Sequence, residues 1–284
     1  MSHDDRAADA TLTLSGQALP ELRIVPRDAV HLHEEADPVR VERLSHRLRA
    51  DGVLRNPPAV APLGGGGYVV LDGANRTSAL ARLGIPVLPV QIVDYDDPGI
   101  RLDVWRHLLV EPLDVAAVLR ARGLAPEDVS AAEAARALDE RMIAAYLLTG
   151  GRAVAVPRSP DRALATILSQ VVDTYKGRAR IYRVPTSDLD ILAGAYGPIA
   201  AVVVFPTLTK QDIIEIADAP AKLPTGITRH LIAGRALRVN LPLEALRTAQ
   251  DLTATNRWLA GLVRRRLLDH SIRYYPEGAF LFDE

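Results

Sequence analysis

The amino-acid sequence predicts a mixed α/β protein with two domains, and three features support this. Between residues 21 and 110, apolar stretches of strand length alternate with amphipathic stretches of helix length, an order typical of a mixed α/β unit. A similar alternation returns after residue 160. The chain has 284 residues, 48% of them hydrophobic, which exceeds the usual size of one domain and allows two hydrophobic cores.

In the first of these domains the predicted elements follow one another with short links. Helices are expected at 39–52 and 75–84, and strands at 22–25, 59–63, 68–72 and 87–95, with a polar loop at 31–38 and a glycine-rich hairpin tip at 64–67. Residues 1–20 show no amphipathic period and are expected to be a flexible leader.

The rest of the chain is predicted to be a helical connector followed by a second α/β domain. Apolar residues at helical spacing between 112 and 150 predict two or three helices. Beyond them, helices are expected at 164–175, 209–217 and 251–270, and strands at 180–184, 199–206 and 235–243. The predicted domains are therefore a leader at 1–20, an N-terminal domain at 21–110, and the connector with the second domain at 111–284.

Composition excludes several classes of function. The formal net charge is −1, so there is no global positive field to concentrate DNA or an anionic membrane. The absence of cysteine excludes disulfides, thiolate nucleophiles and cysteine-ligated metals. The polar N-terminus and the lack of any apolar stretch of bilayer length predict a cytoplasmic protein without a membrane partner.

The segment LDGANRTSAL (71–80) combines the features of a phosphate-binding turn. A predicted strand leads directly into a helix, with Asp72 and Gly73 at the junction and Arg76 in the first helical turn. Backbone N–H groups, the helix dipole and a guanidinium therefore converge where an anion can bind. Asn75 and Thr77 can add side-chain donors, and Asp72 is placed to hold a divalent cation, Mg²⁺, against phosphate oxygens. The alternative is an ordinary capped helix with a solvated arginine.

The run from Leu22 to Tyr95, with GVLRNPPAVAP followed by YVVLDGANRTSALARLGIPVLPVQIVDY, resembles the ParB/sulfiredoxin superfamily, whose hallmark is a DGxxR-type turn that opens a helix. The resemblance implies a ParB/sulfiredoxin-like N-terminal domain. It also implies that the turn binds nucleotide phosphates through Gly73, Ala74, Asn75, Arg76 and Thr77.

Three branches of this superfamily compete. Sulfiredoxins need a catalytic cysteine, which this chain lacks. Chromosome-partitioning proteins should follow the module with a basic DNA-binding region, but residues 111–150 hold seven acidic residues against four arginines, which disfavours a nucleic-acid partner. The free-serine kinase group resembles the chain further in the HxHE loop, in the DVWRHLL segment and in LPTGITRH.

The loop HLHEEADP (31–38) contains the predicted catalytic base. In the kinase interpretation one glutamate accepts the proton of the substrate hydroxyl. Glu34 is the first choice because it follows the HxH pattern, and Glu35 is the second. The alternative is a solvated acidic loop that caps the next helix.

LPTGITRH (223–230) has the composition of a tight binding loop. Arg229 can hold the carboxylate of an amino acid with two parallel hydrogen bonds, while Thr228 and His230 can orient its ammonium and carboxylate groups. The alternative is a surface turn. Trp105 lies in a helix-like apolar stretch that suggests core packing, and only the resemblance assigns Trp105 and His107 to the substrate site.

The sequence thus predicts a kinase that transfers a phosphoryl group from ADP or ATP to the hydroxyl of free L-serine, giving O-phospho-L-serine for cysteine biosynthesis or a related pathway. The alternative is a ParB-like regulator that binds nucleotide and DNA without catalysis.

Overall fold

The computed structural model describes residues 12–14 and 16–275, which form two compact units. Unit 1 contains the described residues up to Val30, Pro38–Gly99, and those from Ile232 onward, and unit 2 contains His31–Asp37 and Ile100–Leu231. This division differs from the predicted boundary at residue 110, because the chain passes between the units four times. The C-terminal segment therefore belongs with the N-terminal domain, whereas the sequence assigned it to the second.

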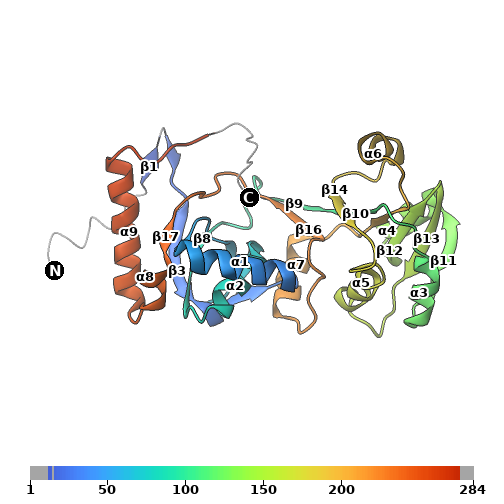
Figure 1. Ribbon diagram of the computed structural model, residues 1–284, viewed down its shortest axis with the longest axis horizontal. Coiled ribbons are helices and arrows are strands. Elements are labelled where there is room, and N and C mark those ends of the chain that lie inside the picture. The colour runs from blue at the N-terminus through green and yellow to red at the C-terminus, as the bar shows by residue number, and fades with distance from the viewer. Residues whose placement is uncertain (1–11, 15, 276–284) are drawn as a thin grey trace. The chain divides into compact units, whose positions relative to one another are not determined.

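Unit 1 is built around a five-stranded sheet with the order β3-β8-β6-β7-β4. β3 pairs antiparallel with β8, β8 runs parallel to β6, and β6 forms an antiparallel hairpin with β7. The predicted hairpin tip lies between β6 and β7. Figure 1 labels β3 and β8 of this sheet. The strands are β3 (Glu21–Pro26), β4 (Val30–Leu32), β6 (Ala59–Pro62), β7 (Tyr68–Asp72) and β8 (Val87–Ile92), and a 3-10 turn at Arg27–Ala29 precedes β4.

Two amphipathic helices, α1 (Pro38–Asp51) and α2 (Ala74–Arg82), pack against each other beside this sheet. Their buried positions, such as Val41 and Leu48 in α1 and Leu80 in α2, recur at the three- and four-residue spacing of a helix face. Both helices were predicted from the sequence, and α2 follows β7 through a single glycine, Gly73.

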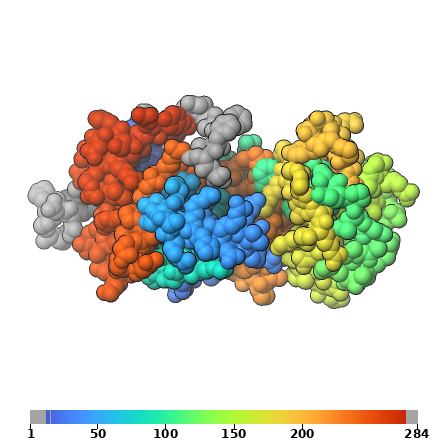
Figure 2. All heavy atoms as spheres, in the orientation of Figure 1, coloured from blue at the N-terminus to red at the C-terminus, as the bar shows by residue number. Residues whose placement is uncertain are grey.

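The C-terminal segment completes unit 1. β17 (Leu241–Pro242) pairs with β5 (Val53–Leu54), and α8 (Leu243–Arg247) and α9 (Leu252–Leu268) follow. α9 packs on β3, where the Asn256 amide accepts a hydrogen bond from the Ile24 N–H and donates one to its carbonyl, both at 2.8 Å. Figure 2 shows α9 in red and α1 in blue on one face of this unit. These two bonds satisfy the backbone of an edge strand, which explains why the segment joins the N-terminal domain.

Unit 2 is built on a six-stranded antiparallel sheet with the order β11-β13-β12-β15-β10-β14. Its core is formed by apolar side chains of the sheet and of α4 and α6. A separate two-stranded ladder joins β9 to β16. The strands are β9 (Arg101–Val104), β10 (Arg106–Leu109), β11 (Glu127–Ser130), β12 (Ile143–Thr149), β13 (Arg152–Pro157), β14 (Ile181–Val184), β15 (Ala201–Val204) and β16 (Thr228–Leu231). The helices are α3 (Val115–Ala121), α4 (Ala131–Asp139), α5 (Leu164–Val172), α6 (Leu189–Tyr196) and α7 (Lys210–Asp218).

The predicted helical connector is wrong in part. α3 and α4 are present, but residues 127–130 and 143–149 are strands. β12 is buried at every position except Thr149, and a continuous apolar run that is buried on both faces cannot be told from a buried helix by periodicity. The helix-like stretch around Trp105 is likewise the junction of β9 and β10.

The strand predicted at 235–243 is reduced to β17. Arg238 and Asn240 have φ values of 54° and 49°, which are incompatible with an extended strand. In the predicted leader, β1 (Thr13–Leu14) pairs with β2 (Gln17–Ala18), while residues 1–11 and 15 lie outside the described residues. Within residues 12–14 and 16–275, no helix combines the length and apolarity that crossing a bilayer requires.

Candidate functional site

The turn between β7 and α2 has the backbone of the predicted phosphate site. Gly73 has a φ of 108°, and a Cβ at this position would lie 3.1 Å from both the Pro58 Cα and the Arg76 guanidinium. Only glycine fits such a position without strain. Gly73 precedes α2 without a side-chain cap, so the first-turn N–H groups of Ala74, Asn75 and Arg76 have no intrahelical carbonyl to bind.

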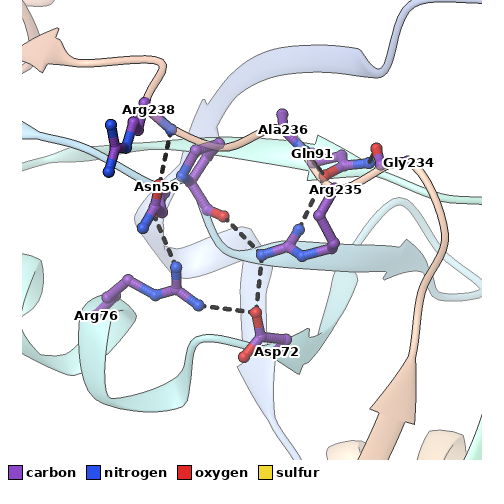
Figure 3. A network of polar contacts seen from close by, with 9 residues as sticks. Asn56, Asp72, Arg76, Gln91, Gly234, Arg235, Ala236 and Arg238 are labelled. Carbon is purple, nitrogen blue, oxygen red and sulfur yellow. Dashed lines mark hydrogen bonds and ion pairs between the residues drawn. The ribbon is translucent and has the colours of Figure 1, made fainter. Parts of the chain in front are cut away.

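The carboxylate of Asp72 is held between two guanidiniums (Figure 3). Its Oδ2 accepts hydrogen bonds from Arg76 Nη2 at 2.8 Å and from Arg235 Nη2 at 2.7 Å. Burial alone would raise the pKa of Asp72, but the two guanidiniums outweigh it and hold that pKa below its usual range. The three side chains therefore carry a net charge of about +1 at neutral pH, which suits an anionic ligand.

Arg235 was not predicted to contribute to this site. Its side chain is only 16% exposed, and its second nitrogen, Nη1, donates to Gln91 Oε1 at 2.9 Å. Gln91 also accepts from the Ala236 N–H at 2.9 Å and donates to the Gly234 carbonyl at 2.9 Å. In Figure 3 the Arg235 guanidinium lies between Gln91 and Asp72. Arg235 is 163 positions away from Asp72, so no local motif could reveal it.

The arginine of the turn is anchored as well. Arg76 Nη1 donates to the Asn56 carbonyl at 3.1 Å, and the Asn56 side chain accepts from the Arg238 N–H at 2.8 Å. Thr77, the last residue predicted to bind nucleotide, is 6% exposed, and its Oγ1 has no hydrogen-bond partner among the described residues. A buried hydroxyl without a partner is costly, so a ligand oxygen at this point would be stabilising.

In unit 2, the HxHE loop and the LPTGITRH segment meet. The Leu223 N–H donates to the His33 carbonyl at 2.9 Å, and the Glu35 N–H donates to the Leu223 carbonyl at 2.7 Å. These bonds form an isolated parallel bridge at Glu34. Two segments that the sequence assigned to one site from separate motifs are therefore neighbours.

The Glu34 carboxylate accepts three hydrogen bonds from this segment. The Gly226 N–H donates to Oε2 at 3.1 Å, and the Thr228 N–H donates to Oε1 at 2.6 Å. The Thr228 hydroxyl also donates to Oε1. Glu35, the second candidate for the base, has an exposed side chain. The geometry thus favours Glu34 over Glu35.

A histidine that the sequence analysis left without a role completes this cluster. His33 is 3% exposed and its Nε2 lies 2.8 Å from Thr228 Oγ1. Because the single hydroxyl proton of Thr228 goes to Glu34, His33 Nε2 must be the donor in this pair. The ring of His33 also meets the edge of His230 at 5.5 Å between centroids. The HxH pattern was the available signal for His33.

Arg229 and Trp105 form a neighbouring pair. The Arg229 guanidinium carbon lies 4.4 Å from the centre of the Trp105 ring, and Nη1 lies 3.7 Å from Asp103 Oδ2. The backbone N–H of Trp105 donates to the Ile227 carbonyl at 2.8 Å. Successive side chains of a strand point to opposite faces, so β16 presents Thr228 and His230 to the Glu34 cluster and Arg229 to the other face.

His107, which the resemblance assigned to the substrate site, is buried beneath the turn at Gly226. It is 2% exposed; its Nδ1 lies 2.8 Å from the Tyr175 hydroxyl and its Nε2 lies 3.1 Å from the Gly226 carbonyl. Burial, together with the positive charge of Arg183, outweighs the Gly226 hydrogen bond and lowers the pKa of His107 to about 4. The side chain is a neutral core group.

The donor set for a metal is small. Among the described residues, no group of three or more histidine, cysteine, aspartate or glutamate side chains is arranged to hold a metal ion. Mg²⁺ in nucleotide sites is commonly bound through one or two carboxylates, with phosphates and waters as its other ligands. Asp72 would be such a carboxylate, with both arginines on its Oδ2.

Comparison with known proteins extends the similarity to nearly the whole chain. The chain is 24% identical over 266 residues to a Staphylococcus aureus protein named ATP-dependent L-serine kinase SbnI, which covers 93% of this chain and 97% of that protein. It is also 24% identical over 224 residues to the ADP-dependent L-serine kinase SerK of Thermococcus kodakarensis, covering 77% of this chain and 90% of the relative. No protein-family model matches the chain.

A solved structure of a free serine kinase in complex with AMP has a TM-score of 0.71 at 20% identity, over 80% of this chain and 94% of that one. The predicted resemblance to free-serine kinases is confirmed. The mixed α/β fold is confirmed too, since C-terminally truncated SbnI from Staphylococcus aureus matches with a TM-score of 0.69 at 23% identity, over 86% of this chain and 96% of that one.

The state of His107 gives a testable prediction. Its native pKa of about 4 lies below the value of about 6.5 for an unfolded histidine. Between these values the unfolded chain binds a proton that the native chain does not. His107 therefore contributes stability above about pH 6.5 that is lost as the pH falls towards 4. NMR of ring-labelled histidine should show a neutral His107 at pH 5.5, and titration of its resonance near pH 6.5 in the folded protein would contradict the assignment.

Proposed function

We propose that this chain transfers a phosphoryl group from ATP or ADP to the hydroxyl of free L-serine, giving O-phospho-L-serine. The observation that carries the proposal is the Glu34 carboxylate, held by Gly226 and Thr228 from 192 and 194 positions away. The relatives named ATP-dependent and ADP-dependent L-serine kinases support the substrate and leave both donors open. The product would supply cysteine biosynthesis or a related pathway.

The nucleotide phosphates would bind at the turn after β7. Backbone N–H groups of Gly73, Ala74 and Asn75 would face phosphate oxygens, and the Thr77 hydroxyl would gain the partner it lacks among the described residues. Arg76 would add a charge-assisted contact. We add Arg235 to this set, because it shares the Asp72 oxygen with Arg76.

Mg²⁺ would be held with the nucleotide through Asp72 and would neutralise charge on the phosphates. The ion pairs to Arg76 and Arg235 fix the carboxylate, so its orientation is set before the nucleotide binds. The chain's own contribution to this part of the reaction is therefore placement and charge.

Serine would bind beside Glu34. The serine oxygen would form a bond to the terminal phosphorus, the bond from that phosphorus to the bridging oxygen would break, and its electron pair would leave with ADP or AMP. The serine hydroxyl proton would pass to Glu34. Thr228 and His230 would orient the substrate. Arg229 lies against Trp105 on the other face of β16, so binding the serine carboxylate, the role that the resemblance implies, would require its side chain to leave the ring and turn towards Glu34.

The direct test is to incubate the purified chain with L-serine, Mg²⁺ and either ATP or ADP, and to measure O-phospho-L-serine by mass spectrometry. D-serine and L-threonine serve as controls for recognition of the free amino acid. Absence of phosphoserine with both donors would overturn the proposal. If the chain instead shifted a DNA duplex in the presence of nucleotide, the non-catalytic ParB-like alternative would replace it.

Glu34→Gln keeps the volume of the side chain and removes its ability to accept a proton. We expect kcat to fall by about 10²–10⁴-fold, while the affinities for nucleotide and serine change little, because the transition state alone needs the base. Glu35→Gln is the matched control and should retain nearly full turnover. A fully active Glu34→Gln enzyme would remove Glu34 as the base.

Arg235→Ala tests the second guanidinium of the phosphate site. Loss of one charge-assisted hydrogen bond is worth about 1.5–3 kcal/mol, so nucleotide binding measured by calorimetry should weaken by about 10- to 100-fold. Arg76→Ala should have a similar effect. Arg238→Ala, an exposed arginine of the same segment, is the control and should bind nucleotide normally. Unchanged affinity in a folded Arg235→Ala protein would limit Arg235 to holding Asp72.

A further inference from the structure

Three buried rings lie beneath the turn that holds Glu34. His107 and Tyr175 are 2% and 0% exposed. The imidazole meets the edge of Tyr175 at 5.9 Å and of Phe205 at 4.9 Å between ring centroids. Neither polar side chain reaches the surface, so neither can bind a substrate directly. Their polar atoms nevertheless form a directed chain of hydrogen bonds.

The direction of this chain follows from the chemistry of its groups. The Gly226 carbonyl can only accept, so His107 Nε2 carries the proton and donates across 3.1 Å. A neutral imidazole then has a lone pair on Nδ1, which accepts from the Tyr175 hydroxyl at 2.8 Å. The Gly226 carbonyl therefore fixes the tautomer of His107, and the Tyr175 hydroxyl supports it by donating to Nδ1.

Gly226 connects these rings to the carboxylate. Its carbonyl is held by His107, and its N–H donates to Glu34 Oε2 at 3.1 Å. Gly226 has a φ of 83°, a conformation in which the turn depends on glycine. The next residue, Ile227, is held through its carbonyl, which accepts from the backbone N–H of Trp105. The residue after that, Thr228, donates its backbone N–H to Glu34 Oε1.

We propose that His107 and Tyr175 are positioning residues for the base: they hold the Gly226 carbonyl so that the Gly226 and Thr228 N–H groups orient the Glu34 carboxylate. This inference rests on the proposed function, in which Glu34 accepts the serine proton. It replaces the substrate-binding role that the resemblance gave to His107 and adds Tyr175, which no motif marked.

Substitution of His107 or Tyr175 would also lower activity if these residues only packed the core. The test must therefore separate loss of packing from loss of positioning. Tyr175→Phe keeps the ring and removes the hydroxyl. We expect kcat to fall by about tenfold or more, with the KM values for serine and nucleotide within about twofold of wild type. Ile167→Val, at a fully buried position of α5, loses core packing without touching the chain of hydrogen bonds and should keep its kcat. Equal losses of kcat in both variants would overturn the inference.

Two substitutions of His107 are expected to rank oppositely in kcat, depending on whether the residue positions the base or only packs the core. His107→Gln keeps an N–H that can donate to the Gly226 carbonyl, whereas His107→Leu is the better apolar filling but has no donor. Positioning predicts that the glutamine variant has the higher kcat. Packing alone predicts the leucine variant to be equal or better, and that result would overturn the inference.

One readout does not depend on kinase activity. In Tyr175→Phe, the amides of Gly226 and Thr228 should show shifted NMR resonances and faster hydrogen exchange, while the amide of Val202 in the core of β15 stays as in wild type. If wild type has no kinase activity but these amides respond, the proposed function fails and the hydrogen-bonded chain stands. Unchanged amides at Gly226 and Thr228 would overturn the positioning role even in an active enzyme.

Discussion

The carboxylate of Glu34 determines much of the local structure of unit 2. A carboxylate that is partly removed from water needs compensating donors, and here backbone N–H groups of Gly226 and Thr228 supply them. To reach these donors, residues 31–37 leave the sheet of unit 1 at β4 and pack within unit 2. The bridge at Leu223, the turn at Gly226 and the ladder of β16 with β9 all fix the donors in place.

In unit 1 it is the cationic groups that need compensating partners. Two largely buried guanidiniums, Arg76 and Arg235, require an acceptor, and Asp72 provides one that serves both. This arrangement ties a loop, a helix start and a C-terminal segment together before any ligand arrives. Because the trio retains a net positive charge, the ion pairs do not cancel the attraction for phosphate. Preorganisation of this kind avoids a reorganisation cost when the nucleotide binds.

The sequence predicted what depends on local chemistry. The strand, glycine and helix of the phosphate turn follow one another directly along the chain, so the geometry of their junction follows from backbone rules that act over one turn. The alternating elements around it were predicted for the same reason. The roles of Glu34 and Thr228 came instead from the resemblance to free-serine kinases, and their contact could not be derived from spacing. Their assigned roles stay predictions until they are tested.

What the sequence did not predict depends on distant contacts. Arg235 reaches Asp72 across 163 positions, and Tyr175 reaches His107 across 68, so neither leaves a local pattern. Burial on both faces erases the alternation of a strand, so the apolar run of β12 resembles that of a buried helix. The domain boundary was placed at residue 110 because nothing local indicates that Asn256 would bond to Ile24.

The hydrogen bonds to Glu34 also bear on how its carboxylate meets the substrate hydroxyl. Three hydrogen bonds from Gly226 and Thr228 hold the carboxylate in one orientation. In a loose phosphoryl-transfer transition state, bond formation to the nucleophile is little advanced, and the hydroxyl becomes acidic only late. A carboxylate that is firmly placed is then in position to accept the proton at that stage. Placement of the carboxylate therefore matters in such a site, and a buried tyrosine and histidine that never touch serine would act on the rate through it.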